Sequence, residues 1–226
     1  MKILLAPSEA KSTLNTHSSL SFSFDVNQKE IIEKFNSFLK INKDFKNFCK
    51  DQTPIEKRET TFAINRYTGV AFKHLDYNSL DKESKEFLNN NLIIFSNLFG
   101  ILKPIDLIPY YTLKQGKTPG FDIYKEYSKY ITPLLDEINK KEIFIDLRAK
   151  FYEKIYKPKN AITFKFIKNN KVVSHFAKAY RGKLTAIISK HKPKTIEDVL
   201  KISFPDIEIV EIIEKKGIKE IVCNVN

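Results

Sequence analysis

The sequence is poor in several residue types that carry common functions. Its 226 residues include no Trp, one Met, six Gly and two Cys. Neither G-x-G-x-x-G nor the Walker A pattern occurs, which argues against nucleotide binding of those two kinds. Cys49 and Cys223 are too few and too far apart for a disulfide framework or a zinc cluster. A reducing cytoplasm is therefore the expected compartment.

Long apolar runs are also missing. The longest are short, such as Leu92–Phe95, and none approaches the roughly 20 residues that a transmembrane helix needs. The opening MKILLAPSEAKS has too short an apolar stretch before Pro7 for a signal peptide. We therefore expect a cytoplasmic protein without a membrane partner.

Signals for metals, cofactors and redox chemistry are weak. The four His residues show no metal-ligand spacing, and H-E-x-x-H is absent. Cys223 falls in an apparent strand, where buried thiols are usually inert, and one neighbouring Lys is a weak activating environment for Cys49. The sequence predicts neither a metal site nor a cofactor, and it gives no oligomeric state.

Positive charge is what the chain has in excess. Lys and Arg number 39 against 27 Asp and Glu, which gives a net charge of +12. The segment from Asp146 to Lys194 holds 14 basic and 2 acidic residues, so these 49 residues carry the whole excess. Localised charge favours a polyanionic or phosphorylated partner. The alternative is a solvated basic face that only maintains solubility.

Apolar runs and periodicities predict strands and helices without regular alternation. The predicted strands are Lys2–Ala6, Leu92–Ser96 and Glu142–Leu147, with hairpins formed by Ile162–Lys168 and Val172–Phe176 and by Ile207–Ile213 and Ile218–Val225. The predicted helices are Asn27–Phe48, one capped by Ser79 or Asp81, Phe121–Asn139, one from about Arg148, Ala177–His191, and one capped by Thr195. This pattern predicts one α+β or irregular α/β domain over residues 1–226, with a mixed sheet and surrounding helices.

Polar clusters come directly after three of the predicted strands. Ligand crevices of mixed α/β sheets lie at the carboxyl ends of strands. If these strand ends are neighbours, one crevice gathers four cations and two acids: Lys11, Arg148, Lys178 and Arg181, with Glu9 and Asp146. In the alternative interpretation, Asp146 caps the next helix and Arg148 pairs with it.

The helix Ala177–His191 has a buried stripe with basic residues on both sides. Lys178 and Arg181 fall on one side of the stripe and Lys183 on the other, and all three are candidates for binding DNA or phosphate. Gly182 interrupts the helix interior at a cost of about 1 kcal/mol relative to Ala. A glycine there is tolerable where a phosphate or another helix must approach the backbone closely.

Five ordered segments resemble motifs of the YaaA family of bacterial peroxide-stress proteins. They are KILLAPSEAKS, RYTGVAF, LFGILKPIDLI, IDLRAKFY and SHFAKAYRGKL, and the resemblance spans nearly the whole chain. It implies a cytoplasmic protein induced by peroxide and linked to low free iron. It also implies a compact fold with a positively charged cleft that binds duplex DNA, and a helix-hairpin-helix-like element.

The resemblance adds two candidate residues for the cleft, and the chain differs from the family motifs at several positions. Arg66 and Lys103 lie within family-like motifs and join the candidates for the cleft, and Leu98–Ile101 loosely fits the hairpin of the DNA-binding element. The chain resembles the branch with a Pro-Ser-Glu-x-Lys opening rather than Pro-Ala-Lys-Thr. Thr112 and Lys114 replace an Arg and a Glu of many members, so no role is carried over to them.

Three functions remain open on the sequence. The first is a double-stranded DNA-binding protein that limits iron-dependent oxidative damage, with Lys and Arg neutralising phosphates. The second is an enzyme acting on a nucleotide or nucleic-acid phosphate, with Glu9 or Asp146 as the acid or base and with Lys11, Arg148 and Arg181 holding phosphate. The third is a protein-interaction module without either activity.

Overall fold

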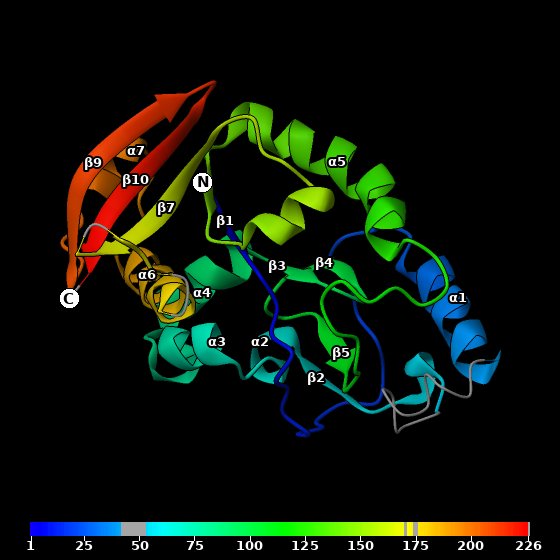
Figure 1. Cartoon of the computed structure of the whole chain (residues 1–226). Helices are drawn as coiled ribbons and strands as arrows, with labels where there is room; N and C mark the ends of the chain where they lie inside the picture. The colour runs from blue at the N-terminus through cyan, green and yellow to red at the C-terminus, as the bar shows by residue number, and fades with distance from the viewer. Residues whose placement is uncertain (42–52, 170, 174–175, 226) are drawn as a thin grey trace.

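An eight-stranded mixed sheet forms the centre of the molecule (Figure 1). The computed structural model describes residues 1–41, 53–169, 171–173 and 176–225. Within them the strand order is β4-β3-β1-β6-β7-β10-β9, and β8 pairs with β7. The strands are β1 (Lys2–Leu5), β3 (Leu92–Ser96), β4 (Gly100–Leu102), β6 (Phe144–Asp146), β7 (Ala161–Lys168), β8 (Lys171–Val172), β9 (Ile207–Lys215) and β10 (Ile218–Val225).

The middle of this sheet is parallel. β1 pairs in parallel with both β3 and β6, β6 with β7, and β7 with β10, whereas β4 and β9 pair antiparallel at the two edges. Leu5 is in register with Ile94, and Leu4 with Asp146. The carboxyl ends of β1, β3 and β6 therefore open at one edge of the sheet, where ligand crevices form in such folds.

Helices cover the sheet, and their starts follow local capping signals. The Asp81 carboxylate accepts a hydrogen bond from the Ser84 N–H, and Thr195 and Asp198 form a capping box. In Figure 1, α5 lies on one side of β1, and α3, α4 and α6 lie on the other. The helices are α1 (Gln28–Ile41), α2 (Ala63–Arg66), α3 (Val70–Leu75), α4 (Lys82–Asn91), α5 (Ile123–Lys141), α6 (Ala177–His191) and α7 (Ile196–Leu200).

A smaller sheet and short 3-10 helices complete the fold. β2 (Thr60–Phe62) pairs antiparallel with β5 (Leu107–Pro109). The 3-10 helices are η2 (Ile55–Lys57), η3 (Tyr77–Ser79) and η4 (Lys150–Lys154). In the described part of the chain, no helix is both long and apolar enough to cross a bilayer.

The predicted fold class is confirmed: the chain forms one mixed-sheet α/β domain with surrounding helices. The predicted second strand and the helix Ala177–His191 have the predicted bounds, and the terminal hairpin is present. The predicted end of the first helix, after Ile41, falls with Cys49 outside the described residues.

Two local predictions were wrong. The helix expected from Arg148 is only the short η4, because the Arg148 side chain turns back onto Asp146 and holds the chain in a loop. Leu98–Ile101 is no part of a helix-hairpin-helix. It lies in the tight connection of β3 to β4, where Ser96 pairs with Gly100 and the Phe99 side chain is buried.

Candidate functional site

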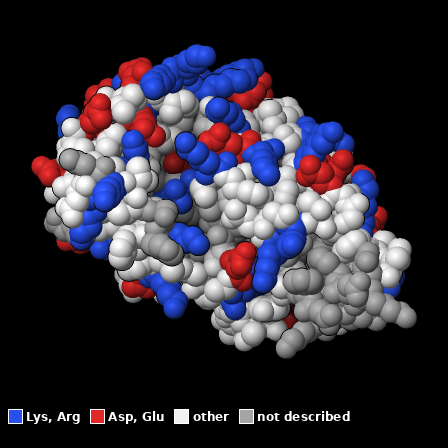
Figure 2. Space-filling model, in the orientation of Figure 1, with Lys and Arg blue, Asp and Glu red and all other residues white. Residues whose placement is uncertain are grey.

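A cavity of about 290 Å³, here named the strand-end cavity, lies where β1, β3 and β6 end. Its wall combines the loop after β1, the start of α3, residues after β3 and β6, and the start of α6. The lining residues are 5–10, 69–72, Asn97, Gln115, Leu147, Ala149, Tyr152, Lys178 and Arg181. In the view of Figure 2, Lys and Arg side chains lie around a hollow on the face of the molecule.

Close packing and hydrogen bonds hold the wall of the strand-end cavity in place. A Cβ atom on Gly69 would lie 2.1 Å from Ser8 Oγ, so the glycine lets the loop after β1 approach the start of α3. The Tyr152 hydroxyl donates to Asn97 Oδ1 over 3.0 Å, and Asn97 Nδ2 donates to the Leu113 carbonyl over 3.1 Å. The first bond connects the end of β3 to the segment that follows β6, and the second connects it to the segment that follows β5.

Lys178 and Arg181 enter the cavity from the first turns of α6. Lys178 is exposed, whereas Arg181 is partly buried. Burial lowers the pKa of Arg181, and the Asp146 charge opposes this shift. Over the described ranges no hydrogen bond or ion pair engages the Arg181 guanidinium, so its donors are available to a ligand.

Two contacts fix α6 against its neighbours. The Tyr180 ring stacks on Phe166 of β7 with 5.3 Å between ring centroids. A Cβ atom on Gly182 would lie 2.0 Å from the carbonyl oxygen of Ala71 in α3. Of the two reasons that the sequence offered for Gly182, the close approach of another helix is therefore the one observed.

Glu9 is the single acid among the residues that line the cavity. Its side chain is exposed, and its Oε1 accepts a hydrogen bond from the Gln115 backbone N–H over 3.3 Å. The bond ties the loop after β1 to the chain beyond β5. A carboxylate that lines a cavity can accept a proton from a bound ligand, and its protonated form can donate one.

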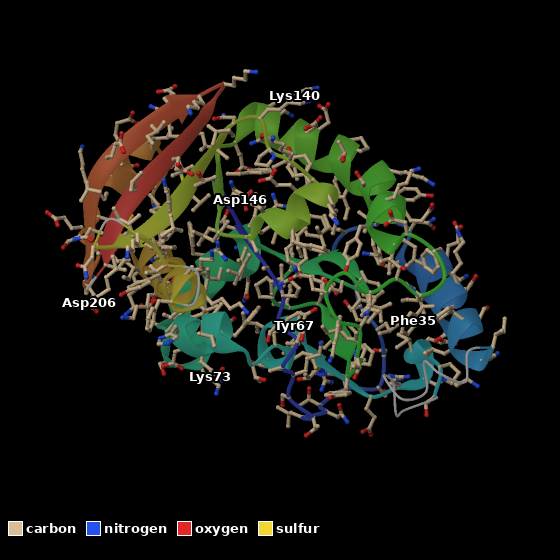
Figure 3. The ribbon with its side chains drawn as sticks, viewed as in Figure 1. Phe35, Tyr67, Lys73, Lys140, Asp146 and Asp206 are labelled. Atoms are coloured by element: carbon tan, nitrogen blue, oxygen red, sulfur yellow. The ribbon has the colours of Figure 1, made fainter. Side chains whose placement is uncertain are left out.

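Lys11 lies at the edge of the cavity rather than in its wall. Its Nζ donates to the main-chain oxygen of Glu9, a lining residue, over 3.3 Å. The amine also stands 4.2 Å from the Tyr111 ring centroid and 5.8 Å from that of Tyr67, which Figure 3 labels. Burial lowers the pKa of Lys11 to about 8; Glu9 opposes this shift and Arg66 adds to it.

Asp146 and Arg148 pair with each other, as the alternative interpretation of the sequence allowed. The Asp146 carboxylate accepts from Arg148 Nε over 2.8 Å and from Nη2 over 2.7 Å. Arg148 also donates to the carbonyls of Tyr152 and Tyr156, and its guanidinium lies 4.1 Å from the Phe95 ring centroid. The pair is largely buried and holds the loop after β6 in place.

Three other candidates lie away from the strand-end cavity. Arg66 is fully buried and donates to the carbonyls of Ser12 and Ile108. Lys103 Nζ faces the Phe24 ring, and Lys183 pairs with Asp206 over 3.2 Å. The cavity thus brings together Glu9, Lys178 and Arg181, with Lys11 at its edge and Asp146 close to Arg181.

Reasoning from the sequence did not single out several residues of the site. Asn97 directly follows the strand Leu92–Ser96, so the rule about strand ends would have found it. Gln115, Tyr111 and Tyr152 carry no comparable signal, because their places depend on how distant loops fold together.

The described residues contain no arrangement suited to a metal ion, and their one free thiol is buried. Within them no group of three or more His, Cys, Asp or Glu side chains is arranged to hold a metal ion. Burial raises the pKa of the Cys223 thiol to about 12, so the thiol stays protonated and unreactive at neutral pH.

These features define an α/β protein whose candidate ligand site lies at the carboxyl ends of parallel strands. The model of the family described as peroxide stress protein YaaA matches residues 1–211. The chain belongs to this YaaA family, whose members are also called UPF0246 proteins.

Several relatives are similar over most of the chain. A Campylobacter jejuni protein, "Uncharacterized protein Cj0984", is 38% identical over 240 residues, which cover 97% of each chain. A UPF0246 protein of Malacoplasma penetrans is 31% identical and covers 80% of this chain and 83% of its own. One of Colwellia psychrerythraea is 34% identical over 67% of this chain and 65% of its own.

Proposed function

We propose that this protein binds duplex DNA through the cations at the strand-end cavity and so limits iron-dependent oxidative damage to DNA in the cytoplasm. The family supports the link to peroxide stress. The Pro7–Lys11 opening supports assignment of the chain to the Pro-Ser-Glu-x-Lys branch of the family.

One observation carries the DNA-binding proposal. Lys178 and Arg181 enter the cavity side by side from α6, and no acid among the described residues pairs with either of them. They belong to the segment 146–194, which holds the whole net charge of the chain. Unpaired cations at a concave surface attract phosphates, and their release of counterions drives binding.

The other candidate cations have different roles in this proposal. Lys11 lies close enough to add to the positive potential at the cavity edge. The Arg148 and Arg66 guanidinium groups donate to protein acceptors, so we assign them to positioning the loops around the cavity. Lys103 and Lys183 lie outside the cavity wall and would contact only DNA that extends beyond it.

The salt dependence of duplex binding tests the proposal. We expect log K to fall linearly with log salt, by about 0.9 for each phosphate contacted. The double variant Lys178→Ala/Arg181→Ala should lower the magnitude of that slope by up to roughly two, with similar losses on unrelated sequences. Fluorescence anisotropy with two duplexes of different sequence measures both quantities.

A matched control separates a local contact from a general loss of charge. Lys129→Ala/Lys140→Ala also removes two positive charges, but from exposed ion pairs on α5. This variant should keep the slope of the unmodified protein. An equal slope in the cavity variant and the unmodified protein would remove Lys178 and Arg181 from the interface.

A second candidate function is an enzyme that acts on a nucleotide or nucleic-acid phosphate in the same cavity. The specific observation in its favour is Glu9, an exposed carboxylate in a wall that otherwise contributes two cations. Incubating the protein with nucleotides and with damaged duplexes, and analysing the products chromatographically, tests this candidate. Absence of any product would leave binding as the function.

A further inference from the structure

The Lys11 amine has an unusual environment for a lysine. It lies over the Tyr111 ring, close to the Tyr67 ring, and its single hydrogen bond among the described residues goes to the main-chain oxygen of Glu9. No carboxylate in the described ranges forms an ion pair with it. The side chain is half-buried, and the hydrogen bond of its amine to Glu9 is exposed.

This environment favours a neutral, nucleophilic amine. The charged groups that face it are the Glu9 carboxylate, which stabilises the ammonium ion, and the Arg66 guanidinium, which destabilises it. Burial outweighs both and lowers the pKa to about 8. About one tenth of such amines are neutral at pH 7, against fewer than about one in a thousand at an ordinary lysine. Desolvated lysines of this kind form Schiff bases with carbonyl compounds.

We propose that the Lys11 amine forms an imine with the aldehyde of a phosphorylated ligand that occupies the strand-end cavity. The neutral amine attacks the aldehyde carbon and forms a C–N bond. Nitrogen then loses its two protons, the former carbonyl oxygen gains them, and water leaves. The product is a C=N bond without any change of oxidation state, so the step needs no oxidant or reductant.

The cavity fits an aldehyde that carries a phosphate. Arg181 and Lys178 offer donors for the phosphate, while Glu9 connects the wall to the edge where Lys11 lies. A volume of about 290 Å³ suits one sugar phosphate. This aldehyde has two possible sources, a free sugar phosphate or the open-chain sugar of a base-less site in duplex DNA. The second source rests on the proposed function.

Hydride trapping tests the proposal. The intact protein is incubated with sodium cyanoborohydride and either deoxyribose 5-phosphate or a duplex with one base-less site, and the modified peptide is then identified by mass spectrometry. We expect the reduced adduct on Lys11, with a rate that rises as pH increases through about 8. Lys11→Arg and Lys11→Met should each lower the yield by about tenfold or more, because each ordinary lysine that remains holds about a hundredfold less neutral amine.

Matched controls keep the result interpretable. Lys140 is an exposed lysine on α5 and has no such environment. Lys140→Arg should therefore give the same yield of reduced adduct as the unmodified protein. Melting temperatures establish that the Lys11 variants fold. Equal trapping in Lys11→Arg, or adducts spread evenly over exposed lysines, would overturn the proposal.

The two sources are separated by the two probes. An adduct on Lys11 with either probe supports imine formation, and the probe that reacts identifies the source. Absence of an adduct with both probes overturns the proposal. Affinity for an intact duplex is measured in parallel, so a failure of DNA binding appears there and leaves the reaction with the sugar phosphate unaffected.

Discussion

The Asp146 carboxylate holds the Arg148 guanidinium through two bonds of 2.7 and 2.8 Å, although the two residues are only two positions apart in the chain. The Arg148 side chain is 1% exposed, so the Asp146 carboxylate compensates a charge that is buried. The same guanidinium donates to the Tyr152 and Tyr156 carbonyls. The pair therefore fixes the loop that carries the β6 side of the cavity.

Removing Asp146 alone should be strongly destabilising. Asp146→Leu leaves a buried, uncompensated guanidinium, and we expect a loss of about 3–5 kcal/mol in the free energy of unfolding. The double variant Asp146→Leu/Arg148→Met removes both charges and should recover much of the loss. Urea denaturation of the three proteins measures both effects. A double variant less stable than Asp146→Leu would contradict this account.

Gly182 should not tolerate even a methyl group. Ala normally stabilises a helix interior by about 1 kcal/mol relative to Gly. Here the Cβ atom would lie 2.0 Å from the Ala71 carbonyl, so α3 and α6 must separate. We expect Gly182→Ala to lower stability by about 1–3 kcal/mol, measured by denaturation. Lys190→Ala, on an exposed position of the same helix, should stay within about 0.5 kcal/mol.

Glu9→Gln separates binding from catalysis. Gln keeps an oxygen for the Gln115 N–H, so the melting temperature should hardly change. If DNA binding is the function, affinity should be equal or slightly higher, because a charge that repels phosphate is gone. If Glu9 is a general acid or base, binding should survive while peroxide protection is lost, with a rate loss of about 10²–10⁴. Affinity, melting and peroxide survival of this one variant distinguish these outcomes.

Lys11 should make stability depend on pH in a defined window. Its pKa is about 8 in the folded protein and about 10.5 when unfolded, so between these values the unfolded chain binds more protons. Stability then rises with pH through the window, by roughly 1–3 kcal/mol. Burial raises the pKa of Tyr67, which has the opposite effect above about pH 10 in all variants. The difference between the unmodified protein and Lys11→Met, followed by urea denaturation from pH 7 to 10, isolates Lys11. A constant difference would refute the shift.

The sequence alone determined most elements of the fold. The runs KILL and LIIFS formed β1 and β3, and helical periodicity located α5 and α6. These signals are local, since an apolar run or a periodic stripe can be recognised without knowing which element packs against it. The loop at Leu98–Ile101 was assigned wrongly from a resemblance, and β4 was missed because a three-residue strand has almost no pattern of its own.

Only the tertiary structure decided which cations face the cavity. From the sequence, Arg148 and Arg181 were both candidates for the crevice, and the pairing of Arg148 with Asp146 was an open alternative. In the fold Arg148 is buried against Asp146 and two carbonyls, while Arg181 lines the cavity. The environment of Lys11 likewise comes from Tyr67 and Tyr111, which are remote in the chain. The number of charged residues follows from composition. Whether a charged side chain can reach a ligand, and what its pKa is, depend on burial and on the partners that folding brings together.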